Sequence, residues 1–222
     1  MKILVISAHP DDETLGCGGT LVRHRDQGDE LAWAVVTAAY VPVWTEQIVR
    51  RKQTEKESVA ASYGIESPVF MDLPAARLDT VPFEQLIQSM DEVVEKTAPE
   101  IVYIVHGGDV HSDHRIVHQA ILSALKPPRM KDLGVKRILA YETLSSTEAG
   151  GTEEHTIFVP NLFIDISRYI DKKIDIMSLY ASETQDDPMP RGVSAIRALA
   201  RYRGATIGVE YAEAFMLVRE II

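Results

Sequence analysis

The stretch "KILVISAHPDDETLGCGG", residues 2–19, joins an apolar run to a charged turn and a glycine-rich helix start. The run from Lys2 to Ser7 has the length and composition of a strand that is buried on both faces. A helix is expected from Glu13 to Gln27, with Gly28 as its stop. Between them stand a histidine, a proline and two adjacent aspartates, whose charges repel each other and need partners at the end of a buried strand. This turn is therefore the first candidate for a functional site.

Beyond this unit, strand-like and helix-like segments alternate along the chain. Strands are predicted at residues 31–38, 67–73, 101–105 and 136–143. Helices are predicted at residues 46–63 and 82–100, and a third helix follows the polar loop after residue 105 and stops at Pro127. The C-terminal part predicts an extended segment at 156–167 and helices at 168–182 and 193–202. Residues 211–222 suit either a helix or a strand, and a strand after a helical turn is preferred. This alternation predicts one α/β domain over residues 1–222, with a Rossmann-like, mostly parallel sheet flanked by helices. The loops near residues 40, 75, 150 and 186 are the expected walls of a binding cleft.

Composition excludes several classes of protein. The chain has 222 residues, 45% of them hydrophobic, and a formal net charge of −10. That charge argues against nucleic acid or an anionic membrane as the main partner, because both favour basic surfaces. No stretch approaches the roughly 20 apolar residues of a membrane span, and the start lacks the pattern of a secretory signal. With Cys17 as its one cysteine, the chain is expected to be soluble and cytoplasmic.

Polar side chains follow the first and fourth predicted strands. In an open parallel sheet the carboxyl ends of neighbouring strands meet at one crevice, so these groups are expected to lie together. One imidazole and one carboxylate from the first turn, with one imidazole from the second, suit a catalytic divalent metal with water in the remaining position. The side chains concerned are His9, Asp11 and Asp12 after the first strand, and His111, Asp113 and His114 after the fourth.

The expected metal is zinc, although Fe²⁺, Co²⁺ or Ni²⁺ would accept the same nitrogen and oxygen ligands. If one aspartate of the first turn binds the cation, the other can act as a base beside it. His111 is the candidate to donate to an oxyanion and to protonate a leaving amine, and Asp113 is placed to orient one of the histidines.

Simpler interpretations exist for several of these residues. Asp12 and Glu13 taken alone could merely cap the helix, and Cys17 is more simply a small buried side chain than a reactive thiol. A dinucleotide site is disfavoured, because the glycines at 16, 18 and 19 do not follow the G-x-G-x-x-G spacing; close packing of the helix on the sheet explains them better. Structural or bystander roles are expected for His106, Asp109, His24, His118 and His155.

The two motifs, "AHPDDE" at residues 8–13 and "HSDH" at residues 111–114, resemble those of the PIG-L/LmbE family of metal-dependent N-deacetylases. The resemblance extends to "GGT", "HGGDVHSDHR", "YET", "PNLFIDIS" and "RALARYRGATIGVEYAEAF". It implies that His9, Asp12 and His114 bind zinc, that Asp11 is the general base, that His111 stabilises the oxyanion or acts as acid, and that Asp113 tunes His111 or its neighbours. It also implies a small-molecule substrate of the N-acetylglucosamine type, which loses acetate, and a homo-oligomer, trimer or hexamer.

Other expectations from the resemblance concern the substrate. Relatives often carry a substrate-binding arginine near the start of the second helix, where Arg50 and Arg51 both stand, and Arg191 could meet a polar substrate. Many relatives have a histidine where this chain has Met189. The alternative to an N-deacetylase is a sugar-binding member of the same fold without turnover.

Overall fold

The structure is a computed structural model that describes residues 1–153 and 156–222, so His155 lies outside the described residues. The strands are β1 (Lys2–Ser7), β2 (Glu30–Ala38), β3 (Val69–Pro74), β4 (Ile101–Val105), β5 (Arg137–Tyr141), β6 (Leu162–Asp165) and β7 (Ala212–Glu220). The helices are α1 (Asp12–Asp26), α2 (Glu46–Tyr63), α3 (Phe83–Thr97), α4 (Ser112–Ala124), α5 (Pro127–Leu133), α6 (Ile170–Met177) and α7 (Val193–Ile207), with one 3-10 turn, η1 (Leu78–Thr80).

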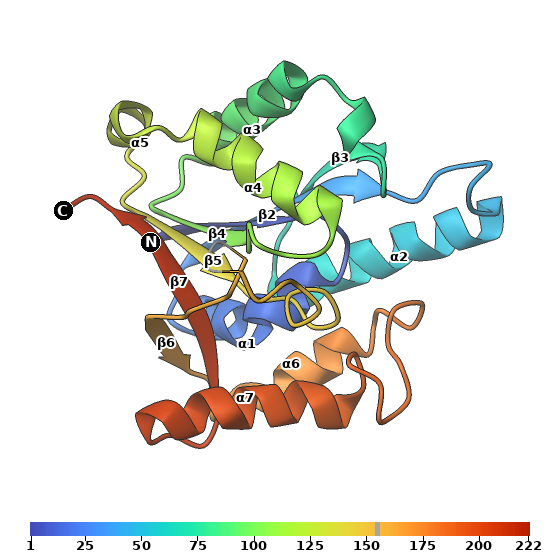
Figure 1. The fold of residues 1–222 in the computed structure, drawn as a ribbon, viewed down its shortest axis with the longest axis vertical. Coiled ribbons are helices and arrows are strands. Elements are labelled where there is room, and N and C mark those ends of the chain that lie inside the picture. Colours follow the sequence, from blue (N-terminus) through green and yellow to red (C-terminus); the bar gives the residue numbers. More distant parts are fainter. Residues whose placement is uncertain (154–155) are drawn as a thin grey trace.

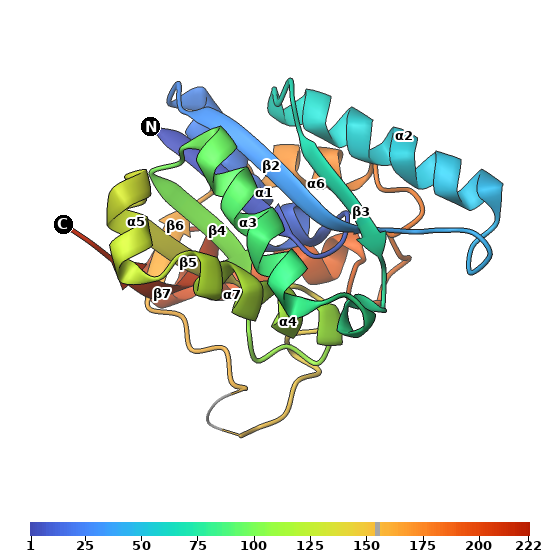
Figure 2. The same ribbon diagram turned by 90° about the horizontal axis from the view of Figure 1, so that it is seen from above.

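The strands form one sheet in the order β3-β2-β1-β4-β5-β7-β6. The first five strands are parallel, and β7 runs antiparallel to both of its neighbours, β5 and β6. Helices α1, α2, α6 and α7 cover one face of the sheet, and α3, α4 and α5 cover the other (Figures 1 and 2). The expected Rossmann-like, mostly parallel α/β fold is confirmed.

The strand order explains where the functional groups meet. The chain moves outward from β1 to β3 and then returns to place β4 on the other side of β1. Because each parallel crossover is right-handed, this reversal sends the helix after β1 and the helix after β4 to opposite faces of the sheet. A crevice opens between the carboxyl ends of β1 and β4, as expected at such a switch point.

Most predicted elements appear within a few residues of their expected bounds, and three differ. Pro127 does not only end a helix: α4 ends at Ala124, and Pro127 begins the short helix α5, where its fixed φ suits the first helical position. The extended segment 156–167 forms ladder hydrogen bonds only as β6, and α6 is shorter than predicted. Among the described helices, none has the length and apolar character needed to cross a bilayer.

The glycines of α1 lie against protein side chains, not against an open phosphate cradle. A Cβ at Gly16 would come 2.1 Å from the Tyr141 ring, and one at Gly19 would come 2.8 Å from Ile166. These contacts support the close-packing interpretation and leave no room for a dinucleotide. Cys17, between them, is fully buried, and burial raises the pKa of its thiol well above the usual range, which makes it a structural side chain.

A buried ion pair supports a kink in α1 at Cys17, where the backbone leaves helical geometry. The break exposes two backbone N–H groups, and the Glu213 carboxylate on β7 accepts from Gly19 N at 2.9 Å and from Thr20 N at 2.7 Å. Lys173 from α6 donates to the same carboxylate and to Leu15 O, both at 2.7 Å. The pair therefore ties α6, α1 and β7 together directly behind the polar turn.

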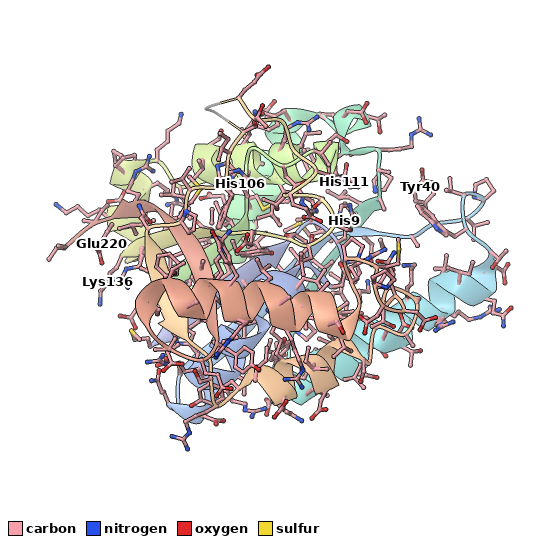
Figure 3. The ribbon with its side chains drawn as sticks, turned by 60° about the horizontal axis from the view of Figure 1, so that its bottom comes forward. His9, Tyr40, His106, His111, Lys136 and Glu220 are labelled. Atoms are coloured by element: carbon pink, nitrogen blue, oxygen red, sulfur yellow. The ribbon has the colours of Figure 1, made fainter. Side chains whose placement is uncertain are left out.

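We expect Glu213→Gln to lower the free energy of unfolding by about 3–5 kcal/mol, because it leaves the buried Lys173 ammonium without a counter-charge. Urea denaturation of the purified chain measures this loss. The matched control is Lys136→Met, at the far end of the molecule (Figure 3), which breaks an exposed pair with Glu100 and should change stability little. Equal losses in the two variants would contradict the role given to the buried pair.

Candidate active site

The loops after β1 and β4 bring the six predicted side chains to one place. His9 follows β1, Asp11 is the N-cap of α1, and Asp12 is its first residue. His111 is the N-cap of α4, and Asp113 and His114 stand in its first turn. Figure 3 shows His9 and His111 close together, and their ring centroids are 4.3 Å apart. The sequence expectation that two loops about a hundred residues apart meet in one site is therefore fulfilled by the geometry.

Two imidazoles face each other at the centre of this cluster. His9 Nδ1 lies 3.1 Å from His114 Nε2. The other ring nitrogen of each histidine faces a carboxylate: His9 Nε2 donates to Asp113 Oδ2 at 2.9 Å, and His114 Nδ1 lies 3.1 Å from Asp109 Oδ2, an ion-pair contact poorly aligned for a hydrogen bond. These carboxylates hold the ring protons on the outer nitrogens, so two lone pairs point at each other. With the rings in these tautomers, the two facing nitrogens are free to bind a positive charge between them.

Asp12 completes a set of donor atoms around the same point. Its Oδ1 lies 3.3 Å from His114 Nε2, and its Oδ2 lies 3.7 Å from His9 Nδ1 and accepts from the His9 backbone N–H at 2.7 Å. Two nitrogen ligands of a tetrahedral zinc, each about 2.0–2.1 Å from the metal, stand about 3.3 Å apart. The spacing of the donor atoms of His9, His114 and Asp12 thus fits a divalent metal.

The electrostatics of the metal-free site favour a cation at this point. Burial lowers the pKa of His114, but the charges of Asp12 and Asp109 outweigh it and raise that pKa well above its usual range. Burial likewise opposes ionisation of Asp12, whose pKa is nevertheless lowered by the charges of His114 and His9. The opposite pKa shifts of His114 and Asp12 thus indicate a site that favours positive charge next to the Asp12 carboxylate.

Asp113 and Asp109 are buried carboxylates that orient the histidines. Besides the bond to His9, Asp113 accepts from the backbone N–H groups of Ala76 at 2.7 Å and Leu78 at 3.2 Å. Asp113 was expected to tune His111 or its neighbours, and its carboxylate contacts His9. Asp109, expected to be structural, lies against His114 and accepts from the hydroxyls of two loop residues, Ser146 and Thr147.

His111 shares the cluster but differs in its protonation. Its Nδ1 accepts from the Asp113 backbone N–H at 3.2 Å, so the neutral ring carries its proton on Nε2. Burial, together with the neighbouring His9 and His114, lowers the pKa of His111 to about 4. Ligand atoms of the three histidines all lie within 4.8 Å of one another. The Nε2–H group makes His111 a hydrogen-bond donor beside the set formed by His9, His114 and Asp12.

Asp11 stands beside the ligand set and has a cationic partner. Its φ of 103° lies in the left-handed region, a strained conformation for a residue other than glycine. Burial, and next the charge of Asp12, raise the pKa of Asp11 well above its usual range, while Arg191 opposes the shift by donating to Asp11 Oδ2 at 3.2 Å. Backbone strain and unfavourable burial therefore coincide at the residue predicted to be the base.

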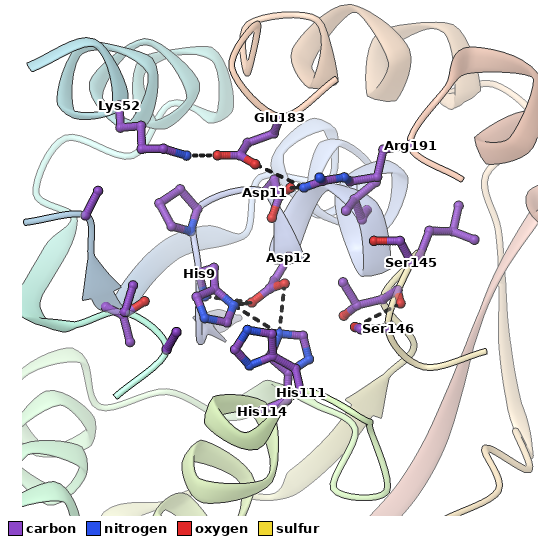
Figure 4. Close-up of a pocket in the computed structure, with 18 of the residues that line it drawn as sticks. His9, Asp11, Asp12, Lys52, His111, His114, Ser145, Ser146, Glu183 and Arg191 are labelled. Carbon is purple, nitrogen blue, oxygen red and sulfur yellow. Dashed lines mark hydrogen bonds and ion pairs between the residues drawn. The ribbon is translucent and has the colours of Figure 1, made fainter. Parts of the chain in front are cut away.

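A cavity of about 380 Å³ opens in front of these groups (Figure 4). Its walls come from the loops near residues 40, 75, 145 and 186, close to the four predicted positions. Its lining combines apolar surface with polar side chains, among them His9, Asp11, Asp12, His111 and His114. The apolar lining residues are Pro10, Leu15, Ala39, Trp44, Ala75, Ala76, Val110 and Leu144.

Of the three predicted substrate-binding arginines, one lines the cavity and two do not. Arg191 lines the cavity. Arg50 and Arg51 do not: they lie on the exposed side of α2 and pair with carboxylates on the same helix. The neighbouring Lys52 points into the cavity instead, next to Glu183 from the loop between α6 and α7. Sequence analysis missed both Lys52 and Glu183.

The other histidines among the described residues have structural partners outside the cavity. His24 lies between Asp29 and Tyr103, at 2.7 and 2.9 Å. His106 contacts the carbonyl of Thr156 and His118 that of Val105. Met189 is half exposed and is absent from the cavity lining.

Comparison with known proteins places these features in context. A family model described as "PIG-L: GlcNAc-PI de-N-acetylase" matches residues 4–125. The chain is 30% identical over 149 residues to the uncharacterized deacetylase YaiS of Escherichia coli, covering 65% of this chain and 75% of that protein. It is 25% identical over 229 residues to the diacetylchitobiose deacetylase of Thermococcus kodakarensis, covering 98% of this chain and 83% of the relative.

A similar fold is found among solved structures. The crystal structure of a conserved protein from Thermus thermophilus superimposes with a TM-score of 0.77 at 25% identity, covering 100% of this chain and 97% of that one. The similarity thus includes the C-terminal part of the chain, beyond the segment that the family model matches.

Proposed function

Since the chain belongs to the PIG-L family, described as GlcNAc-PI de-N-acetylase, we propose that it is a metal-dependent hydrolase that removes the acetyl group from an N-acetylglucosamine-type sugar or conjugate. The names of its relatives, among them a diacetylchitobiose deacetylase and N-acetylglucosaminyl malate deacetylases, support this reaction and this substrate class. They also favour catalysis over the alternative of a sugar-binding protein without turnover.

One observation supports the proposal most strongly. The facing lone pairs of His9 Nδ1 and His114 Nε2, 3.1 Å apart, stand next to the Asp12 carboxylate at the floor of an open cavity. We assign the metal to these three residues and take zinc as the ion, with Fe²⁺, Co²⁺ and Ni²⁺ as the other candidates. A divalent metal bound there would lower the pKa of a coordinated water toward about 7 and polarise an amide carbonyl.

Each neighbouring residue then has a role in the hydrolysis of the acetamide. Asp11 lines the same cavity and accepts the proton of the attacking water on its carboxylate, then returns it to the nitrogen of the leaving amine. His111 donates its Nε2 proton as a hydrogen bond to the carbonyl oxygen, where negative charge develops. Asp113 holds His9 in place, and Asp109 does the same for His114.

Arg191 acts on the base and is also placed to meet the substrate. It holds the Asp11 carboxylate toward the cavity through a single hydrogen bond, and its side chain lines the same cavity. Lys52 lies in the same wall, and we propose that these two side chains, not Arg50 or Arg51, contact the sugar. A homo-oligomer, trimer or hexamer, and a cytoplasmic location stay part of the proposal on the strength of the family resemblance.

Purified chain loaded with zinc is expected to release equimolar acetate and free amine from N,N'-diacetylchitobiose or another N-acetylglucosamine derivative. Dialysis against a chelator should abolish release, and added zinc should restore it, because the ligand set binds the ion reversibly. Amine-reactive fluorescence and an acetate assay measure the two products. If the chain binds one zinc per molecule and still releases nothing from a panel of acetylated amino sugars, the alternative of a binding protein is favoured.

A further inference from the structure

Charged side chains line the wall of the cavity that faces away from the histidines. Lys52 extends from α2, whereas Glu183 and Arg191 belong to the loop between α6 and α7. Their side chains are only 22%, 16% and 25% exposed. Figure 4 shows the three in a row that ends at Asp11, opposite His9 and His114. This row faces the part of a substrate that extends beyond the acetamide.

Glu183 pairs with both cations of this row. One of its oxygens pairs with Lys52 Nζ, and the other accepts from Arg191 Nη1 at 3.0 Å. The same Nη1 donates to Asp11 at 3.2 Å. Two cations and two carboxylates therefore alternate, and their formal charges cancel. Of the described residues that line the cavity, Lys52 and Arg191 are the lysine and arginine side chains, so no unpaired cation of these types faces the substrate.

The loop that carries Glu183 is fixed to α2. Ser182, next to it, donates its backbone N–H to Glu55 at 3.0 Å and its hydroxyl to the same carboxylate at 2.5 Å. Glu55 is buried on α2, one turn after Lys52. Because these bonds hold the loop against the helix, the backbone of Glu183 is kept beside α2, and its carboxylate is preorganised between Lys52 and Arg191.

A carboxylate or phosphate on the substrate would therefore find both cations occupied and would face the charge of Glu183 at close range, which is unfavourable. A neutral group with hydroxyls can accept from Lys52 and Arg191 and donate to Glu183 without breaking the row. We propose, on the basis of the deacetylase function above, that the cavity selects amino-sugar conjugates whose remaining part is uncharged. Glu183 is the specificity-determining residue that excludes anionic ones.

The test compares two matched substrates, the methyl glycoside of N-acetylglucosamine and its carboxymethyl glycoside, which differ by one carboxylate. With zinc-loaded protein, kcat/KM for the neutral substrate is expected to exceed that for the anionic one by roughly tenfold or more. Glu183→Gln should raise the anionic-to-neutral ratio by roughly tenfold or more, since it removes the repelling charge and frees a cation. Glu183→Asp keeps the charge and should keep the ratio low. Glu46→Gln, which removes a surface charge at the start of α2, is the control and should leave the ratio unchanged.

The specificity proposal would be overturned if the unmodified chain used the two glycosides equally, or if the ratio stayed the same in Glu183→Gln. Hydrolysis of the neutral glycoside would still support the deacetylase function in either case. Release of acetate from neither glycoside would instead contradict that function. In that case the affinities of the two glycosides, measured by calorimetry on the metal-loaded chain and on Glu183→Gln, decide the specificity proposal by the same ratio.

Discussion

Asp11→Asn is expected to lower kcat by roughly 10²–10⁴-fold, the usual contribution of a general base, while the chain still binds its metal. The amide has nearly the shape of the carboxylate and tolerates the left-handed backbone found at this position, but it cannot take a proton from water at neutral pH. His9, Asp12 and His114, the proposed ligands, are unchanged. Steady-state acetate release measures the loss, and atomic absorption of the dialysed protein measures the retained metal.

The same variant is expected to be at least as stable as the unmodified chain when both are metal-free. Burial and the charge of Asp12 raise the pKa of Asp11, so the ionised carboxylate opposes folding at neutral pH, and its removal relieves the repulsion. Arg191 keeps Glu183 as its partner. Lower activity with an undiminished Tm supports a catalytic role for Asp11. Full activity would show that Asp11 is not the base, and a fall in Tm would indicate a structural role.

The fold followed from local patterns because the decisive segments are long and regular. The apolar run of β1, the helical period of α2 and the alternation of both types predict a mostly parallel sheet. The strand order, which reverses between β1 and β4, comes from the structure. The C-terminal strand β7 was harder to predict, since "AEAFMLVRE" suits a helix as well as a strand. Its antiparallel pairing with β5 and β6, which lie far away in the sequence, decides between them.

The sequence predicted which side chains lie together after β1 and β4, but it predicted their contacts less well. Helical spacing places Lys52 on the same face of α2 as the buried residues Lys56 and Val59, so it could have been predicted as a cavity residue. Arg50 and Arg51 were predicted instead because arginine is the residue type expected to bind the substrate. Asp113 lies two residues after His111, and side chains two positions apart on a helix do not face each other. The Asp113 carboxylate therefore does not contact the His111 ring and contacts His9 instead.

Loop conformation set the limit of sequence analysis. Glu183 stands in a loop without periodicity, and its position depends on Glu55, a residue 128 positions earlier whose carboxylate anchors the loop through Ser182. Asp109 similarly owes its place to the hydroxyls of Ser146 and Thr147, which reach it from the loop after β5. Contacts between residues so far apart in the sequence cannot be predicted from local sequence patterns.

His114→Ala is expected to weaken zinc binding by roughly 10³-fold or more and to abolish acetate release. The substitution removes one of three proposed ligands, whereas loss of a group that only orients a ligand typically costs 10–100-fold in affinity. Competition against a fluorescent zinc indicator measures the affinity without any need for turnover. His9→Ala should behave in the same way, and because the His9 side chain is 19% exposed while that of His114 is 2% exposed, it should disturb folding less.

Graded variants separate ligands from orienting residues. Asp113→Asn weakens the bond that holds His9, so zinc affinity is expected to fall within the 10–100-fold range, between the unmodified chain and the ligand variants. His111→Ala should leave affinity close to that of the unmodified chain while acetate release falls, because its Nδ1 is engaged with the backbone and its Nε2 carries a proton. If zinc affinity instead depends on His111 and not on Asp12, the three histidines hold the metal. Asp12 is then a second carboxylate beside the base and not a ligand.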